Sequence, residues 1–273
     1  MSNHMLPKVV TFDGEARSGK GTIAQATKDF LRDVHGYKVM LIDAGQVFRV
    51  LVVAATRAGV DLNNPDEIDE FLSNNDNAQK CVQLVKDVYQ MPKKDRDVLL
   101  YTNEVGANSA KVGARPLSQH FKDELLKKWL HDAHDEGYEI VLLDGRALEE
   151  TGTMLEASGL CRFAMGLYFV CDAKTGARRT LGHALVPQEQ LEGIAKDEVE
   201  ALVQQIFARN EADKTRAVQP IVPPQNAPVF YLPDIPHTHE FEGARPMAIM
   251  DTSADMTKDA MTQPVSKFVA KHL

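Results

Sequence analysis

One loop near the amino terminus constrains the fold more than any other part of the chain. A short apolar run, residues 8–12, leads into the loop DGEARSGKGT at residues 13–22, which has the spacing Gly-x4-Gly-Lys, and a segment of helical periodicity follows. Glycines allow the backbone to curl so that several N–H groups point at one spot, and the helix N-terminus adds partial positive charge. A strand, this loop and a helix in this order predict a phosphate-binding P-loop.

Within this loop, Lys20 is expected to reach the β- and γ-phosphates of a nucleotide. The general motif has serine or threonine after the lysine as a magnesium ligand, whereas this chain has Gly21 there and Thr22 one residue later. A glycine turn that binds nothing is the alternative interpretation. Dinucleotide binding does not fit, because it would leave the lysine unexplained. The predicted nucleotide-binding residues are Gly14, Glu15, Ala16, Arg17, Ser18, Gly19, Lys20, Gly21 and Thr22.

Apolar runs and helical segments alternate along the chain. Buried strands are predicted at residues 8–12, 38–42, 139–143 and 165–170. Helical periodicity marks residues 22–34, 78–89, 117–134 and 185–209, with a terminal helix from residue 256. Strands that alternate with helices form βαβ units, so we expect an α/β fold whose parallel sheet carries helices on both faces. Residues 220–239 hold several prolines and show little periodicity.

Composition narrows the class of protein. The 273 residues carry a net charge of -8, which argues against a nucleic-acid polymer as partner, because such proteins need a cationic surface. No apolar run approaches the roughly 18 residues that would span a bilayer, so we expect no membrane partner. Cys81, Cys161 and Cys171 are far apart and form no CxxC pair, which favours reduced thiols and a cytoplasmic protein.

Motifs further along the chain extend this interpretation. They are IDAGQVFR at 42–49, AGVDL at 58–62, EVG at 104–106 with KV at 111–112, LDGR at 143–146, ARR at 177–179 and RNEADKTRAVQP at 209–220. Together with the P-loop they resemble the cytidylate kinases over nearly the whole chain. The last motif is the most specific, because its two arginines, its aspartate and the Ala-Val-x-Pro that follows are typical of the segment leading from that family's lid to its last strand.

The resemblance implies both an architecture and an activity. It implies a single P-loop kinase domain over residues 1–273, with an insertion that binds the nucleoside monophosphate near residues 50–115 and a lid near residues 178–216. The implied reaction transfers the γ-phosphoryl group of ATP, with Mg²⁺, to CMP or dCMP. The implied partners are small-molecule nucleotides, and a monomer is the usual state in that family.

The resemblance also assigns roles to charged residues. Phosphoryl transfer gathers negative charge, and the planar fork of arginine grips two phosphate oxygens at once. The catalytic residues it implies are Lys20, Arg146, Arg209 and Arg216. The substrate-binding residues it implies are Asp43, Arg49, Arg146, Asp213 and Arg216. Asp43 and Asp144, at strand ends, could hold magnesium-bound water, whereas Asp13 is interpreted as a structural turn residue.

Several positions depart from the family pattern. Arg17 replaces a glycine of the P-loop, and polar groups that read the acceptor base are replaced at Ala44, Ala110, Gln119 and Ala147. Loss of buried hydrogen-bonding groups should lower the specificity for the acceptor more than it lowers the rate of phosphoryl transfer. Three hypotheses therefore stay open: a cytidylate kinase that contacts cytosine through other groups, a P-loop kinase of a different nucleotide or small metabolite, and a non-catalytic nucleotide-binding module.

Two histidines in the sequence PHTHE, His237 and His239, have a spacing that suggests a metal site. This spacing on a loop is a weak signal. We predict an exposed polar loop there and no protein-built metal site.

Overall fold

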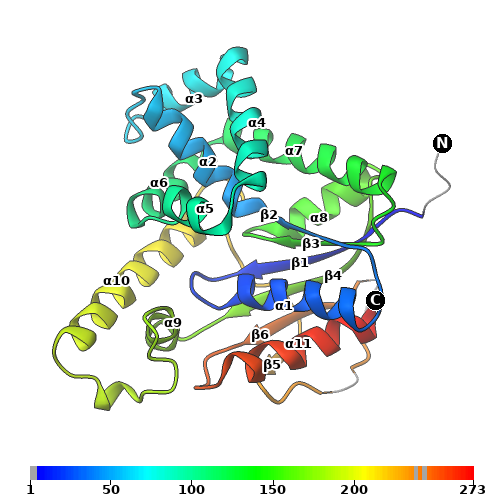
Figure 1. Ribbon diagram of the computed structural model, residues 1–273, viewed down its shortest axis with the longest axis vertical. Coiled ribbons are helices and arrows are strands. Elements are labelled where there is room, and N and C mark those ends of the chain that lie inside the picture. Colours follow the sequence, from blue (N-terminus) through cyan, green and yellow to red (C-terminus); the bar gives the residue numbers. More distant parts are fainter. Residues whose placement is uncertain (1–4, 237–238, 242–244) are drawn as a thin grey trace. The chain divides into compact units, whose positions relative to one another are not determined.

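The computed structural model describes residues 5–236, 239–241 and 245–273. In this part of the chain, six strands form one sheet in the order β2-β3-β1-β4-β6-β5 (Figure 1). The strands are β1 (Lys8–Gly14), β2 (Val39–Asp43), β3 (Ile140–Asp144), β4 (Arg162–Val170), β5 (Val229–Tyr231) and β6 (Met247–Asp251). The sheet is parallel and flanked by helices, which confirms the α/β fold predicted from the alternating pattern.

Helices account for most of the remaining described residues. They are α1 (Lys20–Asp33), α2 (Ala44–Arg57), α3 (Pro65–Ser73), α4 (Asn75–Gln90), α5 (Lys93–Leu100), α6 (Asn103–Gly113), α7 (Pro116–Asp135), α8 (Leu148–Ala157), α9 (Ala173–Thr180), α10 (Gly193–Thr215) and α11 (Lys258–His272), with a 3-10 turn at Gln188–Gln190. The chain divides into two compact units. Unit 1 holds residues up to Ile42, 129–214 and 221–273, and unit 2 holds residues 43–128 and 215–220.

The core of unit 1 lies mainly between the sheet and helices α1 and α11. Side chains alternate between the two faces of a strand, so Val10 and Phe12 of β1 face these helices together with Phe169 of β4. The next residue, Asp13, points to the opposite face, where its carboxylate accepts hydrogen bonds from backbone N–H groups at the start of α8. Helices therefore cover both faces of the sheet, as predicted.

Asp13 joins the end of β1 to α8 through a fully buried set of hydrogen bonds. Its carboxylate accepts from the backbone N–H groups of Gly14 at 2.6 Å, Ala147 at 3.0 Å and Leu148 at 2.6 Å. Ala147, the N-cap of α8, has no side-chain oxygen to serve these amides. The arrangement supports the structural interpretation of Asp13.

We expect Asp13→Ala to lower the free energy of unfolding by about 3 kcal/mol or more, because each buried N–H left unpaired costs about 1–3 kcal/mol. Urea denaturation of the two proteins measures this difference. Asp13→Asn keeps an acceptor oxygen, so its free energy of unfolding should lie between those of the wild type and of Asp13→Ala. A difference below about 0.5 kcal/mol for the alanine variant would show that water replaces the carboxylate.

Unit 2 is helical, and its core is built by α2, α3, α4 and α6 around Leu51, Phe71 and Cys81. The polar stretch before α4 folds because its asparagines cap helices. Asn64 accepts from Asp66 N–H at the start of α3, and Asn74 accepts from Asp76 N–H at the start of α4. This stretch lacks apolar periodicity, but its asparagines are the N-caps of α3 and α4.

Periodicity did not predict α2, α3, α5, α6, α8, α9 or β6, and two further segments differ from the predictions. The helix predicted at residues 185–209 begins only at Gly193 and continues to Thr215, because Pro187 precedes a 3-10 turn and interrupts the pattern. Residues 220–239, which hold several prolines and show little periodicity, contain the short strand β5, and β5 forms the edge of the sheet beside β6. The three residues of β5 are too few for periodicity to reveal.

Candidate functional site

The loop between β1 and α1 adopts the curled backbone that its glycines predict. Gly14 and Gly19 have φ values of 123° and 85°, and Arg17, at 59°, is also left-handed. Glu15 N–H donates to the carbonyl of Phe169, which fixes the loop to β4. The N-cap of α1 is Gly19, which has no side chain to bond the first helical amides. These amides therefore suit an anionic ligand.

Gly21 lies against the carboxylate of Asp144. A Cβ at position 21 would lie 2.8 Å from Oδ2 of Asp144. The serine or threonine of the general P-loop motif would therefore require the end of this side chain to turn aside. Asp144 stands at the end of β3, which places its carboxylate beside the start of α1.

Charged groups gather around Lys20 in unit 1. Burial lowers the pKa of Lys20 to about 8; the positive charges of Arg146 and Arg209 act in the same direction, while Asp144 and Asp13 oppose them. The amine also lies 3.4 Å from the carbonyl oxygen of Glu15. Cations placed this close to one another are costly without an anion, which makes the cluster suited to phosphate.

We expect the affinity for ATP to fall as pH rises above about 8. Free Lys20 loses its proton there, whereas the negative charge of bound phosphate would keep it protonated, so binding weakens by up to about tenfold per pH unit. Titration calorimetry from about pH 7 to about pH 9.5 measures this. Lys20→Arg stays charged throughout and should show no such decline. A parallel decline in both proteins would assign the effect to another group.

The carboxyl-terminal half of α10 carries a second part of this cluster. Arg146 forms an ion pair with Asp213, and Nε of Arg209 lies 4.0 Å from the same carboxylate. Asn210 of this helix accepts a hydrogen bond from Ala16 N–H of the P-loop at 2.9 Å, and Lys214 lies 3.6 Å from the Glu15 carboxylate. The structure thus brings Lys20, Asp144, Arg146, Arg209 and Asp213 together around one loop.

Unit 2 holds the other predicted substrate-binding residues. Asp43 caps α2 by accepting from Gln46 N–H at 2.9 Å. Arg49, one and a half turns further along α2, donates to the Leu100 carbonyl at 2.9 Å and lies over the ring of Tyr101 at 4.6 Å. Arg216 follows α10 and donates from Nε to the carbonyl of Gln219 at 2.6 Å.

Three residues near these groups were absent from the sequence-based set. Asn210 and Lys214 contact the P-loop and lie within the motif RNEADKTRAVQP, which is the sequence signal that marks them. Tyr101 belongs to no motif, and its contact with Asp43 joins positions that are far apart in sequence. No local pattern signals such a contact.

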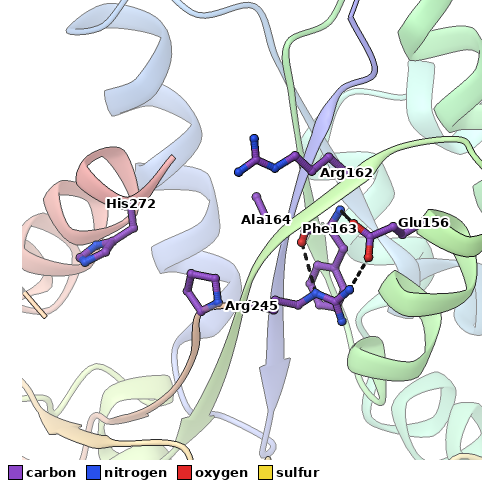
Figure 2. Close-up of a pocket in the computed structure, with 7 residues that line it drawn as sticks. Glu156, Arg162, Phe163, Ala164, Arg245 and His272 are labelled. Carbon is purple, nitrogen blue, oxygen red and sulfur yellow. Dashed lines mark hydrogen bonds and ion pairs between the residues drawn. The ribbon is translucent and has the colours of Figure 1, made fainter. Parts of the chain in front are cut away.

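A pocket of about 550 Å³ opens at the opposite end of the sheet, beside the amino ends of β4 and β6 (Figure 2). Arg245 crosses it: the guanidinium stacks on the ring of Phe163 at 4.2 Å, donates to the Phe163 carbonyl and forms an ion pair with Glu156. These groups satisfy one another, so we assign no ligand to this pocket.

Within residues 5–236, 239–241 and 245–273, no group of three or more His, Cys, Asp or Glu residues could hold a metal ion. His237 lies outside the described residues, and the ring of His239 packs against Phe230 and Phe241. None of the described helices combines the length and apolarity needed to cross a bilayer.

A parallel sheet, a P-loop lysine and arginines collected around the same loop define a P-loop phosphotransferase of the nucleoside monophosphate kinase class. The family model described as cytidylate kinase matches residues 10–232, and the chain belongs to this family. A cytidylate kinase of Vibrio cholerae is 30% identical over 232 residues, which cover 84% of this chain and 90% of the relative. A cytidylate kinase of Shewanella pealeana is 28% identical over 225 residues, covering 80% and 85%.

Proposed function

We propose that this protein transfers the γ-phosphoryl group of ATP to CMP or dCMP. The observation that carries the proposal is the gathering of Lys20, Asp144, Arg146 and Arg209 around the P-loop of a chain that belongs to the cytidylate kinases. Phosphoryl transfer depends on positioning and on neutralising charge, and this cluster supplies both.

The donor would be held by unit 1. The loop amides from Gly14 to Thr22 and the Lys20 amine would bind the phosphates of ATP. Mg²⁺ would supply further charge neutralisation between donor and acceptor phosphates when bound. Asp144 fits a role toward the ion through water, since its carboxylate lies beside Gly21 at the start of α1. Asp43 is proposed for a similar contact.

The acceptor would be held by Asp43, Arg49, Arg146, Asp213 and Arg216, with Asp213 directed to the ribose and the arginines to phosphate. An oxygen of the acceptor phosphate attacks the γ-phosphorus, the bond from the γ-phosphorus to the bridging oxygen breaks, and ADP leaves with that electron pair. The acceptor is already an anion at neutral pH, so no general base is needed. Arg146, Arg209 and Arg216 would stabilise the charge on the transferring group.

Residues 50–115 are proposed as the insertion that binds the monophosphate and residues 178–216 as the lid. Lid closure would exclude water and so favour transfer over hydrolysis. A monomer that acts in the cytoplasm on small-molecule nucleotides, with no nucleic-acid or membrane partner, completes the proposal.

A second candidate is a P-loop kinase with a different acceptor. It is favoured by one contact: Gln119, at the position of a base-reading arginine, donates to the Gly113 carbonyl of its own unit and carries no charge. ADP release with CMP, dCMP, UMP, AMP and GMP separates the candidates. Fastest turnover with CMP or dCMP supports the proposal. Turnover with none, despite tight ATP binding, favours another acceptor or a non-catalytic nucleotide-binding module.

A further inference from the structure

A connected set of side chains surrounds the start of α2 in unit 2. Tyr101 donates its hydroxyl proton to Oδ2 of Asp43 at 2.8 Å, and the guanidinium of Arg49 lies over its ring at 4.6 Å. The same arginine donates to the carbonyl of Leu100, the neighbour of Tyr101. One aromatic residue therefore contacts two of the three groups of unit 2 that we propose for acceptor binding.

Gln46 lies between Asp43 and Arg49 on α2, and its amide orientation follows from Tyr101. The Tyr101 hydroxyl gives its only proton to Asp43, so toward Gln46 it can only accept. The Gln46 side-chain nitrogen accordingly lies 3.5 Å from that hydroxyl. The carbonyl oxygen of the amide, Oε1, therefore points away from the Tyr101 hydroxyl.

Among the described residues, Oε1 of Gln46 has no hydrogen-bond partner, although the side chain is only 3% exposed. Proteins rarely leave a buried acceptor unpaired, so this oxygen calls for a donor from a ligand or from water. Alanine or another apolar residue would fill the position without this cost. An unpaired buried acceptor beside Asp43 and Tyr101 thus indicates a bound group that carries N–H or O–H.

Tyr101 offers a surface as well as a hydroxyl. The residue remains 44% exposed, so part of its ring is open to a ligand. Burial of the hydroxyl and the charge of Asp43 raise the pKa of Tyr101, so it stays a hydrogen-bond donor at neutral pH. An aromatic face held by two polar contacts suits stacking against a planar base or a sugar.

We propose that Gln46 and Tyr101 determine acceptor specificity in this chain: the Gln46 carbonyl accepts a hydrogen bond from a hydroxyl or amino group of the acceptor nucleoside, and Tyr101 packs against it. This inference rests on the proposed function, because it assigns Asp43 and Arg49 to the acceptor. It supplies hydrogen-bonding groups in a chain whose Ala44, Ala110 and Ala147 lack them.

The test uses the full chain and Gln46→Met, which keeps side-chain length and removes the acceptor oxygen. The specificity constants kcat/KM are measured for CMP, dCMP and UMP. If Gln46 reads the ribose 2′-hydroxyl, the preference of CMP over dCMP falls about tenfold or more in the variant. If it reads the base amino group, the preference of CMP over UMP falls by that amount. Gln25→Met, on the exposed face of α1, is the matched control.

Unchanged ratios for both pairs in a folded, active Gln46→Met enzyme would overturn the inference and leave the proposed function standing. Absence of turnover with every nucleotide in the wild-type protein would instead overturn the proposed function. Tyr101→Phe gives an independent readout, because it removes the contact with Asp43 and keeps the ring. We expect a several-fold rise in KM for CMP with KM for ATP unchanged; an equal change in both constants would indicate a merely structural role.

Discussion

Replacing Lys20 by alanine is expected to reduce kcat by about two to three orders of magnitude, the usual cost of removing one charge-stabilising donor from a reacting group. Lys20 is the P-loop lysine that we propose for the donor phosphates, and its neighbours Arg146 and Arg209 would remain. Steady-state rates with ATP and CMP measure the loss.

The variant should keep its fold, since the Lys20 amine makes a single long contact of 3.4 Å with the Glu15 carbonyl among the hydrogen bonds described. Circular dichroism and thermal unfolding check this. Lys28→Ala, on the same helix and outside the proposed site, should retain wild-type rates. If Lys20→Ala kept normal activity, the assignment of the P-loop as donor site would be wrong.

Replacing Gly14 by alanine is expected to have the largest effect on stability. A Cβ there would lie 2.2 Å from the carbonyl oxygen and 2.6 Å from the nitrogen of Phe169, and φ is 123°, which alanine rarely adopts. These backbone atoms belong to the central pairing of β1 with β4, so neither partner can move cheaply. We expect a loss of at least about 4 kcal/mol in the free energy of unfolding, or failure to fold.

Gly36→Ala isolates the contribution of the clash. Gly36 also has a positive φ, 73°, but nothing lies within 4 Å of its virtual Cβ. Gly36→Ala should lower the free energy of unfolding by about 1–2 kcal/mol, because only the left-handed conformation opposes it. Chemical denaturation compares both variants with the wild type. Equal costs would mean that the approach to Phe169 relaxes and that the P-loop tolerates a side chain at this position.

Apolar runs predicted the central strands because burial on both faces removes polar residues from them. Residues 8–12 and 139–143 coincide with β1 and β3 to within two residues at either end. The predicted start of α10, at residue 185, was wrong. The segment between Pro187 and Gly193 has the same charged, amphipathic composition as the helix but does not belong to it. The short strand β5 carries too few residues for a period, and only pairing with β6 defines it.

The P-loop and the arginines were accessible from the sequence because each belongs to a motif whose spacing reflects a local backbone shape. Gln46 lies within the motif at 42–49, but its contact with Tyr101 was not accessible, because that contact depends on how α2 and the end of α5 pack. Asp13 was predicted in part from the sequence. Its position before the loop suggested a turn, while its bonds to α8 appear only when distant segments are brought together.

Phosphorylation of CMP by this chain is measured by separating the nucleotides after incubation of the protein with ATP, Mg²⁺ and CMP. We expect CDP and ADP to form in equal amounts and Lys20→Ala to form neither at a comparable rate. ADP without CDP would indicate hydrolysis, and no product at saturating ATP and CMP would contradict the claim that this chain phosphorylates CMP.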